Sequence, residues 1–280
     1  MGSQSDAMSS EMQKSPLPKK DRVRVTEKQK NGYLPLVSTI IPTVIGREDL
    51  LERACISVKK QTYTNIEIII VKEGLSAPEQ RNIGIERSQG AFIAFLDDDD
   101  EWLPEKIERQ MAVMEQHPEC PLVICHSLDL RFGKRRVSSP PKVIDYGGLI
   151  KSFNLSSTSS YLCRKEYLDS VCGFDTSFRS AQEYDLALQL SLVGDGLVRC
   201  VPEVLMVQHS SHGQISENWG RKIGGILNIY RKYGHEYRLI DHAKTVGLLT
   251  FFFLGYIFGN RIYRALIPLK TLYETLRMGR

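Results

Sequence analysis

The chain has few cysteines, and the six that it has follow no metal-binding or disulfide pattern. None of them forms a CxxC pair, and the N-terminal residues contain no apolar core of the kind found in signal peptides. Because cytoplasmic thiols are kept reduced, these absences favour free cysteines and a cytoplasmic protein. They argue against a structural zinc site and against a small secreted domain held by disulfides.

Long uncharged segments are also scarce. The most apolar one, VGLLTFFFLGYIF at 246–258, would form a helix only about 20 Å long, and the hydrocarbon core of a membrane is ~30 Å thick. We therefore expect no membrane span. Three roles stay open for this segment: packing against the rest of the chain, contact with a second copy, or peripheral contact of residues 244–270 with the inner face of the cell membrane. The charge of +8 over residues 219–280 favours an anionic lipid surface.

Acidic residues are sparse at both ends of the chain and concentrated between them. Residues 1–30 carry a net charge of +3 and residues 219–280 carry +8, which leaves −7 in the middle of a chain whose total is +4. An acidic centre suggests a function that involves a cation. Residues 1–32 have almost no large apolar side chains, so we expect a disordered tail there. Its positive charge is diluted, and we expect no nucleic-acid partner.

From residue 34 on, strand-like apolar runs alternate with amphipathic helical segments. Strands are expected at 37–41, 65–71 and 91–96, and the second is apolar enough to be buried on both faces. A helix should follow each strand: the second of these helices should end at Gly90, and the third should have Pro104 in its first turn. This rhythm predicts an α/β fold with a parallel sheet.

The second half of the chain has a less regular pattern. Strands are expected within 120–132 and 196–209, a strand that enters a helix within 156–169, and a helix over 181–194. After Trp219 the sequence is typical of helices and is both apolar and basic. No internal repeat is present.

Four consecutive aspartates, Asp97 to Asp100, directly follow the third predicted strand. In parallel sheets ligands bind beyond the carboxyl ends of the strands. Grouped carboxylates repel one another unless a cation or hydrogen-bond donors compensate them. Their oxygens suit Mg²⁺ or Mn²⁺, held together with the phosphates of a substrate. The alternative is a solvated acidic turn in which Asp100 caps the next helix.

Four stretches in this order resemble family 2 glycosyltransferases with the nucleotide-sugar-binding GT-A fold. They are QTYTNIEIIIV, RNIGI, FLDDDDEWLPEKI and CGFDTSFRSAQEYDLALQL. The resemblance covers about residues 34–216. It implies an α/β fold with a mainly parallel central sheet flanked by helices, here with a C-terminal helical extension. It also implies inverting transfer of a sugar from a nucleotide-diphospho-sugar, UDP-linked in our interpretation, to a hydroxyl of a glycan or lipid-linked acceptor.

This resemblance divides the chain into three parts. Residues 1–32 would be the tail, 33–216 the catalytic domain, and 217–280 the helical, basic and apolar extension. Within the catalytic domain, 33–128 would be the nucleotide-binding half and 129–216 the acceptor half.

The resemblance also implies which residues bind the donor and the metal. The nucleotide base would lie where the first strand ends, at Pro42 and Thr43. Glu73 would accept a hydrogen bond from uracil, and Asp97 and Asp98 would contact the ribose and nearby groups. Arg81 and Asn82 would lie beside the nucleotide. Asp99 would bind the metal.

The catalytic base is expected in the stretch QEYDL, where the family commonly has EDYDL. Glu183 stands at the position whose carboxylate takes the proton of the acceptor hydroxyl. Glu183 and Asp185 are two residues apart and do not share a helix face, so Asp185 is expected to be structural. The alternative is that both are surface carboxylates.

Two histidines and two tryptophans are further candidates. One of His209 and His212 would be another metal ligand or a phosphate contact, or neither has such a role. Trp102 and Trp219 could stack on a sugar, but a tryptophan placed like Trp102, just before a helix, is more often a packing residue.

Three departures from the family pattern leave the identity of the nucleotide open. Lys72 replaces an acidic residue, Val44 replaces an aromatic one that stacks on the base, and the segment between Glu73 and Arg81 is short. A sugar nucleotidyltransferase is disfavoured because PTVIGRED has a single glycine where such an enzyme would have a glycine-rich loop. A non-catalytic protein that binds nucleotide sugars remains the second interpretation.

Overall fold

A computed structural model describes residues 34–130, 135–151, 155–209 and 219–237, together with a few positions between 243 and 253. The chain divides into two units after residue 33, and the description below concerns the second of them. The expectations for the tail 1–32, for His212 and for most of 246–258 lie outside the described residues.

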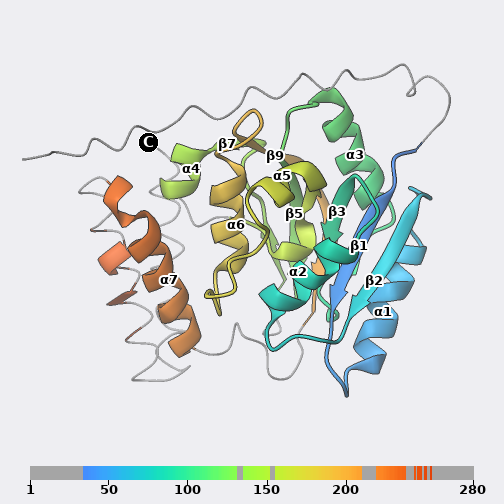
Figure 1. Cartoon of the computed structure of the whole chain (residues 1–280), viewed down its shortest axis with the longest axis horizontal. Helices are drawn as coiled ribbons and strands as arrows, with labels where there is room; N and C mark the ends of the chain where they lie inside the picture. Colours follow the sequence, from blue (N-terminus) through green and yellow to red (C-terminus); the bar gives the residue numbers. More distant parts are fainter. Residues whose placement is uncertain are drawn as a thin grey trace, which may run out of the picture. The chain divides into compact units, whose positions relative to one another are not determined.

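A nine-stranded sheet lies at the centre of this unit (Figure 1). Its strands follow the order β2-β1-β3-β8-β5-β9-β4, while β6 pairs with β5 and β7 with β9. The bounds are β1 Val37–Pro42, β2 Ile66–Val71, β3 Phe92–Phe95, β4 Asp100–Trp102, β5 Leu122–Asp129, β6 Arg136–Ser138, β7 Val143–Asp145, β8 Leu162–Arg164 and β9 Leu197–Gln208.

The sheet is parallel where the sequence predicts it and mixed elsewhere. β1 pairs in parallel with both β2 and β3, and β5 pairs in parallel with β9. The other pairings, such as β3 with β8 and β4 with β9, are antiparallel. Parallel neighbours need a long crossover connection, and helical segments follow β1 and β2 and also lie between β5 and β9. The expectation of a mainly parallel sheet therefore holds for β1, β2 and β3, and the sheet as a whole is mixed.

Helices cover both faces of the sheet. Their bounds are α1 Glu48–Lys59, α2 Ala77–Arg87, α3 Lys106–Gln116, α4 Tyr146–Lys151, α5 Lys165–Ser170, α6 Gln182–Leu190 and α7 Trp219–Tyr233, with 3₁₀ turns η3 Thr158–Ser160 and η5 Gly234–Glu236. Successive strand residues point to opposite faces. Ile40 and Ile93 accordingly join an apolar cluster with α6 and α7, while Ile41 and Ala94 join a second cluster with α1 and α3.

Strand β2 corrects one expectation. It lies at the end of the strand order and pairs only with β1. Most of its residues are half-buried, and Ile70 is exposed. Its run of isoleucines was expected to be buried on both faces, and that was wrong because an edge strand has a neighbour on one side only.

Gly90 and Pro104 also differ from expectation. Helix α2 ends at Arg87, with Ser88 as its cap. Gly90 instead lies just before β3, where an added Cβ would come within 2.6 Å of the carbonyl oxygen of Leu36. Pro104 precedes the first residue of α3, and its carbonyl accepts a 2.9 Å hydrogen bond from the amide of Thr62.

Candidate active site

The four aspartates lie where β3 ends, as expected. Leu96 still donates a 3.0 Å backbone hydrogen bond to Ile40, so the chain leaves β3 beside β1. Asp97 to Asp99 then form a turn, and Asp100 opens β4. Because β1, β2 and β3 are parallel, their carboxyl ends meet at this edge of the sheet.

Asp98 and Asp99 share one cationic partner. The Nη2 atom of Arg47 lies 2.8 Å from Oδ1 of Asp98 and 3.1 Å from Oδ2 of Asp99. Arg53 approaches the same turn from α1 and donates a 2.7 Å hydrogen bond to the carbonyl of Asp99. Arginine side chains therefore compensate the negative charge of this turn.

Thr43 fixes the other side of Asp98. Its hydroxyl donates a 2.7 Å hydrogen bond to Oδ2 of Asp98, and its carbonyl accepts a 2.8 Å hydrogen bond from Gln80. Pro42 directly before it is the last residue of β1 and pairs with Val71. Burial raises the pKa of the Asp98 carboxyl, and the bond from Thr43 opposes this shift.

Arg81 is a buried cation beside Asp97. Its side chain is 3% exposed, and Nη2 pairs with Oδ1 of Asp97. The guanidinium also lies 5.4 Å from the centre of the Phe174 ring. Its Nε and Nη1 atoms find no hydrogen-bond partner within the part of the chain that the structure describes. Buried donors of this kind usually have a partner, so Arg81 retains capacity to bind an anion.

Glu183 lies in the first turn of α6 and belongs to the same charged group. Burial raises the pKa of its carboxyl; the Asp97 carboxylate adds to this shift, while Arg81 opposes it. The buried hydroxyl of Tyr161 donates a 3.0 Å hydrogen bond to the Glu183 carbonyl and holds this turn in place. The helix begins after Ala181, whose φ of 61° is in the left-handed region. Glu183 thus lies near enough to Arg81 and Asp97 for both charges to affect its carboxyl.

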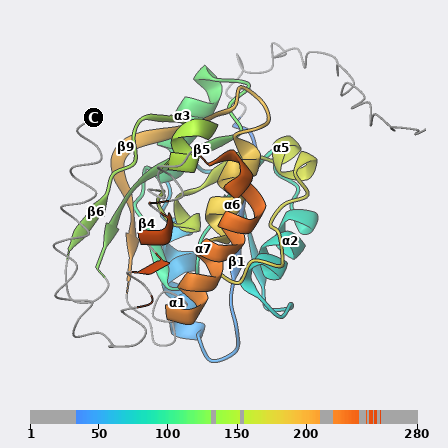
Figure 2. The same ribbon diagram turned by 90° about the vertical axis from the view of Figure 1, so that its left-hand side faces the viewer.

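Asp185 has a different environment from Glu183. It is 1% exposed, and it accepts hydrogen bonds from Gln189, Lys232 and Tyr233 at 2.7, 3.2 and 2.7 Å. Lys232 and Tyr233 belong to α7, which lies beside α6 (Figure 1 and Figure 2). The Asp185 carboxylate therefore joins two helices, which agrees with its expected structural role.

Ser159, which the sequence analysis did not identify, holds the acidic turn through hydrogen bonds to Asp97 and Asp100. Its hydroxyl accepts a 3.0 Å hydrogen bond from the amide of Asp97 and donates a 2.6 Å hydrogen bond to Asp100. Its carbonyl accepts a 2.8 Å hydrogen bond from the indole of Trp102. Asp100 is thus a buried strand residue that holds the turn, and it does not cap the next helix, because α3 begins only after Glu105. Trp102 is 2% exposed and acts as a packing residue.

Two expected donor-binding residues are engaged by the protein itself. The amide of Asn82 donates to the carbonyl of Phe174 and accepts from its backbone N–H, both at 2.8 Å. Asn82 thereby anchors the turn that carries the ring beneath Arg81. Glu73 lies on the exposed loop after β2, and both of its oxygens lie 3.3 Å from the guanidinium of Arg87. Arg87 lowers the pKa of that carboxyl.

His209 lies beside the acidic turn. Strand β9 pairs with β4 so that Gln208 faces Asp100, and the next position along each strand brings His209 toward Asp99. Its Nε2 lies 3.2 Å from Oε2 of Glu101. His209 is therefore near the proposed metal ligand. His212 lies outside the described residues.

Carboxylate oxygens at this edge suit a divalent metal. Among the described residues, no group of three His, Cys, Asp or Glu side chains is arranged to hold an ion. Mg²⁺ and Mn²⁺ need no such group when substrate phosphates supply the other ligands. Oxygens of Asp98 and Asp99 already converge on one nitrogen of Arg47. Two carboxylates that converge on one cation fit a shared metal site.

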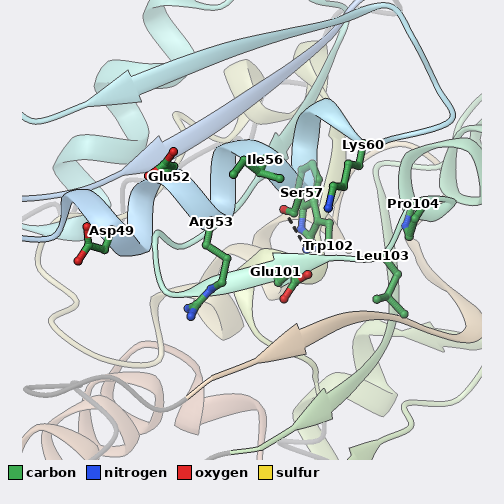
Figure 3. Close-up of a pocket in the computed structure, with 10 residues that line it drawn as sticks. All are labelled: Asp49, Glu52, Arg53, Ile56, Ser57, Lys60, Glu101, Trp102, Leu103 and Pro104. Carbon is green, nitrogen blue, oxygen red and sulfur yellow. Dashed lines mark hydrogen bonds between the residues drawn. The ribbon is translucent and has the colours of Figure 1, made fainter.

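A groove of about 610 Å³ lies next to this turn, between α1 and β4 (Figure 3). Arg53 and Glu101 line it, and a hydrogen bond joins the amide of Trp102 to Ser57 at 3.1 Å. Through Arg53 the groove reaches the backbone of Asp99. It lies on the α1 side of β4 and is lined by neither Arg81 nor Glu183.

All six cysteines are free, as expected, and no helix among the described residues is long and apolar enough to cross a membrane. Trp219 begins α7.

Comparison with solved structures identifies the fold formed by these strands and helices. A mannosyltransferase from Pyrobaculum calidifontis, solved in complex with GDP-Man and Mn²⁺, superimposes with a TM-score of 0.59 at 14% identity. The match covers 86% of this chain and 81% of that structure. At this identity the likeness concerns the fold, and the expected GT-A fold is confirmed.

Sequence comparison supplies the family. The model of glycosyl transferase family 2 matches residues 72–171. The Escherichia coli protein WfaP, a UDP-Glc:alpha-D-GlcNAc-diphosphoundecaprenol beta-1,3-glucosyltransferase, is 26% identical over 227 residues, which cover 72% of this chain and 88% of WfaP. An uncharacterized glycosyltransferase of Haemophilus influenzae is 26% identical over 185 residues, or 55% of this chain, and the chain spans only 62% of its length. The resemblance to family 2 glycosyltransferases that the motifs indicated is confirmed, with the family model matching residues 72–171 and curated relatives named as glycosyltransferases.

Proposed function

We propose that the protein is a metal-dependent, inverting glycosyltransferase that moves a sugar from a nucleotide-diphospho-sugar to a hydroxyl group. The observation that carries this proposal is the grouping of Asp97, Arg81 and Glu183 at the carboxyl ends of β1 and β3. An anion-binding cation and a carboxylate of raised pKa flank the turn that would hold the metal. Donor phosphates and the acceptor hydroxyl can thus meet in one place.

The donor would bind across the acidic turn. The resemblance places the base at Pro42 and Thr43 and assigns its hydrogen bond to Glu73, which the exposed position of the Glu73 carboxylate permits. Asp97 would contact the ribose, Asp98 would contact nearby groups that include the metal, and Arg81 would use its remaining N–H groups on the diphosphate. Asn82 supports this from behind, through its two bonds to the backbone of Phe174.

Asp99, assisted by Asp98, would hold Mn²⁺ or Mg²⁺, with His209 or His212 as a further ligand. When bound, the metal would neutralise the negative charge that grows on the leaving diphosphate. The metal complex of the neighbouring mannosyltransferase structure supports a divalent ion at such a site.

Glu183 would be the base of the reaction. Its carboxylate takes the proton of the acceptor hydroxyl while the hydroxyl oxygen bonds to the anomeric carbon, and the bond from that carbon to the diphosphate oxygen breaks. A raised pKa brings a carboxylate closer to the operating pH and makes it a stronger base. Asp185 takes no part in this step because its oxygens are already bonded to α7 and Gln189.

The acceptor is proposed as a glycan or a lipid-linked sugar. WfaP, which covers most of this chain, is named for a diphosphoundecaprenol acceptor and a UDP-Glc donor. A lipid-linked acceptor agrees with the basic C-terminal residues and with peripheral contact of 244–270 with the inner face of the membrane. A UDP-linked donor is proposed on the same ground.

Thermal unfolding with UDP, GDP and TDP, each with and without Mn²⁺, tests this function. A ligand that binds only the folded state raises the midpoint according to its occupancy. We expect the largest shift with UDP and Mn²⁺ together, and we expect Asp99→Asn to remove the metal-dependent part. Asp169→Asn, which changes an exposed carboxylate of α5, is the matched control. The absence of a shift with every nucleotide would favour a protein that has kept the fold without the function.

Metal-dependent hydrolysis or transfer of the donor separates the enzyme from a non-catalytic binding protein. Such a protein would show the nucleotide shift without turnover of any UDP-sugar. An Asp99→Asn enzyme with unchanged turnover would refute the metal assignment.

A further inference from the structure

Arg47 occupies the position between the two carboxylates of the proposed metal site. A single atom, Nη2, contacts both Asp98 and Asp99, at 2.8 and 3.1 Å. The arginine side chain is 25% exposed, whereas the two aspartates are 8% and 14% exposed. The charged atoms that meet here are thus mostly removed from water, where ion pairs are screened less.

A metal and this guanidinium cannot bind the same two oxygens together. Mg²⁺ binds carboxylate oxygens at about 2.0–2.1 Å, so an ion bound to both aspartates would lie in the space that Nη2 fills. Two positive charges at that distance also repel each other strongly. Metal binding to both carboxylates therefore requires Arg47 to move.

The segment that carries Arg47 permits such a movement. Val44 and Ile45 are 53% and 89% exposed, and nothing lies within 4 Å of an added Cβ at Gly46. Gly46 has a φ of +88°, a conformation that glycine adopts at no steric cost. Thr43 on one side is fixed by its hydrogen bonds to Asp98 and Gln80, and α1 begins at Glu48 on the other. Residues 44–46 and the side chain of Arg47 can thus shift without disturbing β1, while the Arg47 carbonyl keeps its 3.0 Å hydrogen bond from the amide of Leu51 in α1.

We propose that Arg47 is the internal counter-cation of the acidic turn and that it competes with the divalent metal for Asp98 and Asp99. This inference rests on the proposed metal site. It explains how a turn of adjacent, poorly exposed carboxylates is stable without an ion. It also makes Arg47 a residue that sets metal affinity: the free enzyme binds metal weakly, and metal binding releases the Arg47 side chain together with residues 44–46.

Binding of Mn²⁺ alone, followed by the loss of its free-ion electron paramagnetic resonance signal, tests the competition. We expect Arg47→Gln to bind Mn²⁺ about tenfold more tightly than the unaltered protein, because the variant removes a competing charge-assisted contact worth about 1.4 kcal/mol. Arg47→Lys keeps the positive charge but lacks the planar guanidinium. Its affinity for Mn²⁺ should lie between those of Arg47→Gln and the unaltered protein. Arg109→Gln, which removes an exposed arginine paired with Glu105, should leave Mn²⁺ affinity unchanged.

Hydrogen exchange provides a second measurement, independent of affinity. Addition of Mn²⁺ to the unaltered protein should speed amide exchange in a peptide that covers residues 43–48. In Arg47→Gln, addition of Mn²⁺ should change the exchange rate of this peptide little. Circular dichroism and the unfolding midpoint of each variant establish that it is folded.

The outcomes separate this inference from the proposed function. Equal or weaker Mn²⁺ binding by Arg47→Gln overturns the competition, and the metal site itself stands if Asp99→Asn still weakens binding. If neither Arg47→Gln nor the unaltered protein binds Mn²⁺, even with UDP present, both the inference and the metal dependence of the proposed function fail.

Discussion

The phenol of Tyr233 donates a 2.7 Å hydrogen bond to Asp185, two residues from the proposed base Glu183. The same carboxylate lies 2.9 Å from the ammonium group of Lys232. Burial and the bond to Asp185 raise the pKa of Tyr233, so the phenol stays a donor across the physiological range. Helix α7, which lies outside the residues 72–171 that the family model matches, thereby fixes the first turns of α6.

The first prediction concerns this contact. Tyr233→Phe removes a hydrogen bond to a buried charged group and should lower the free energy of unfolding by roughly 2 kcal/mol. Urea denaturation measures it. In an Asp185→Asn background the same change should cost clearly less, because the two residues act as a pair. Equal costs in both backgrounds would show that the bond does not stabilise the fold.

The second prediction concerns Glu183. Glu183→Gln should lower kcat by about 10²- to 10⁴-fold, the usual contribution of a general base, and leave the nucleotide-dependent thermal shift intact. Because burial raises the pKa of this carboxyl above 4.5, activity of the unaltered enzyme should fall with decreasing pH while the solution is still above that value. Glu166→Gln, an exposed residue of α5, is the control. Normal turnover in Glu183→Gln would remove it as the base.

The third prediction concerns Ser159. Ser159→Ala leaves the amide of Asp97 and the carboxylate of Asp100 without the hydroxyl that joins them. An unsatisfied buried polar group costs about 1–3 kcal/mol, so both stability and Mn²⁺-dependent UDP binding should decrease. Ser170→Ala, an exposed serine of α5, should change neither. Unfolding curves and UDP titrations supply the comparison, and an unaltered affinity for UDP would mean that the turn holds its shape without Ser159.

The fourth prediction concerns pH and Lys106. This lysine is fully buried, with its ammonium 2.7 Å from Gln110 and 4.1 Å from the centre of the Trp102 ring. Burial lowers its pKa from 10.5 to about 8. Between these two values the unfolded chain holds the proton that the folded protein has lost, so stability should rise with pH across that window and level off below about 8.

Each pKa unit corresponds to about 1.4 kcal/mol of unfolding free energy, and the contribution of Lys106 is isolated by comparison with a variant that lacks its amine. Lys106→Met should abolish that part of the slope. The measurement is the unfolding free energy of both proteins from pH 7 to pH 10, and parallel profiles would contradict the shift.

The sequence predicted the segment from β1 to the acidic turn well because the signals there are local. A fully apolar strand directly followed by charged residues is visible within ten positions, so the acidic turn and its place after β3 follow from the chain order. Arg81 and Glu183 were found through the motifs that surround them. The edge position of β2 was missed because strand order depends on the whole sheet. A run of isoleucines predicts a strand equally well at the edge of a sheet and in its centre.

Contacts between residues far apart in the chain were not predicted from the sequence, for a different reason. Ser159 is separated from Asp97 by 62 residues and lies in a serine-rich stretch without any pattern. Arg47 follows a loop in which the sequence singled out only Val44, and nothing in its neighbours indicated a contact with Asp98, 51 positions later. The role of Lys232 was also hidden, because a basic residue near the end of a helix is ordinary.

The bridge between α6 and α7 has a practical consequence for the design of shortened proteins. The sequence motifs suggest that a fragment ending at residue 216 would contain the whole catalytic domain. Such a fragment would leave the Asp185 carboxylate without Lys232 and Tyr233, and would uncover the apolar side chains that Ile229 and Tyr237 now cover. A buried charge without its partners is strongly destabilising. The smallest portion suited to expression and crystallisation therefore extends at least to residue 237.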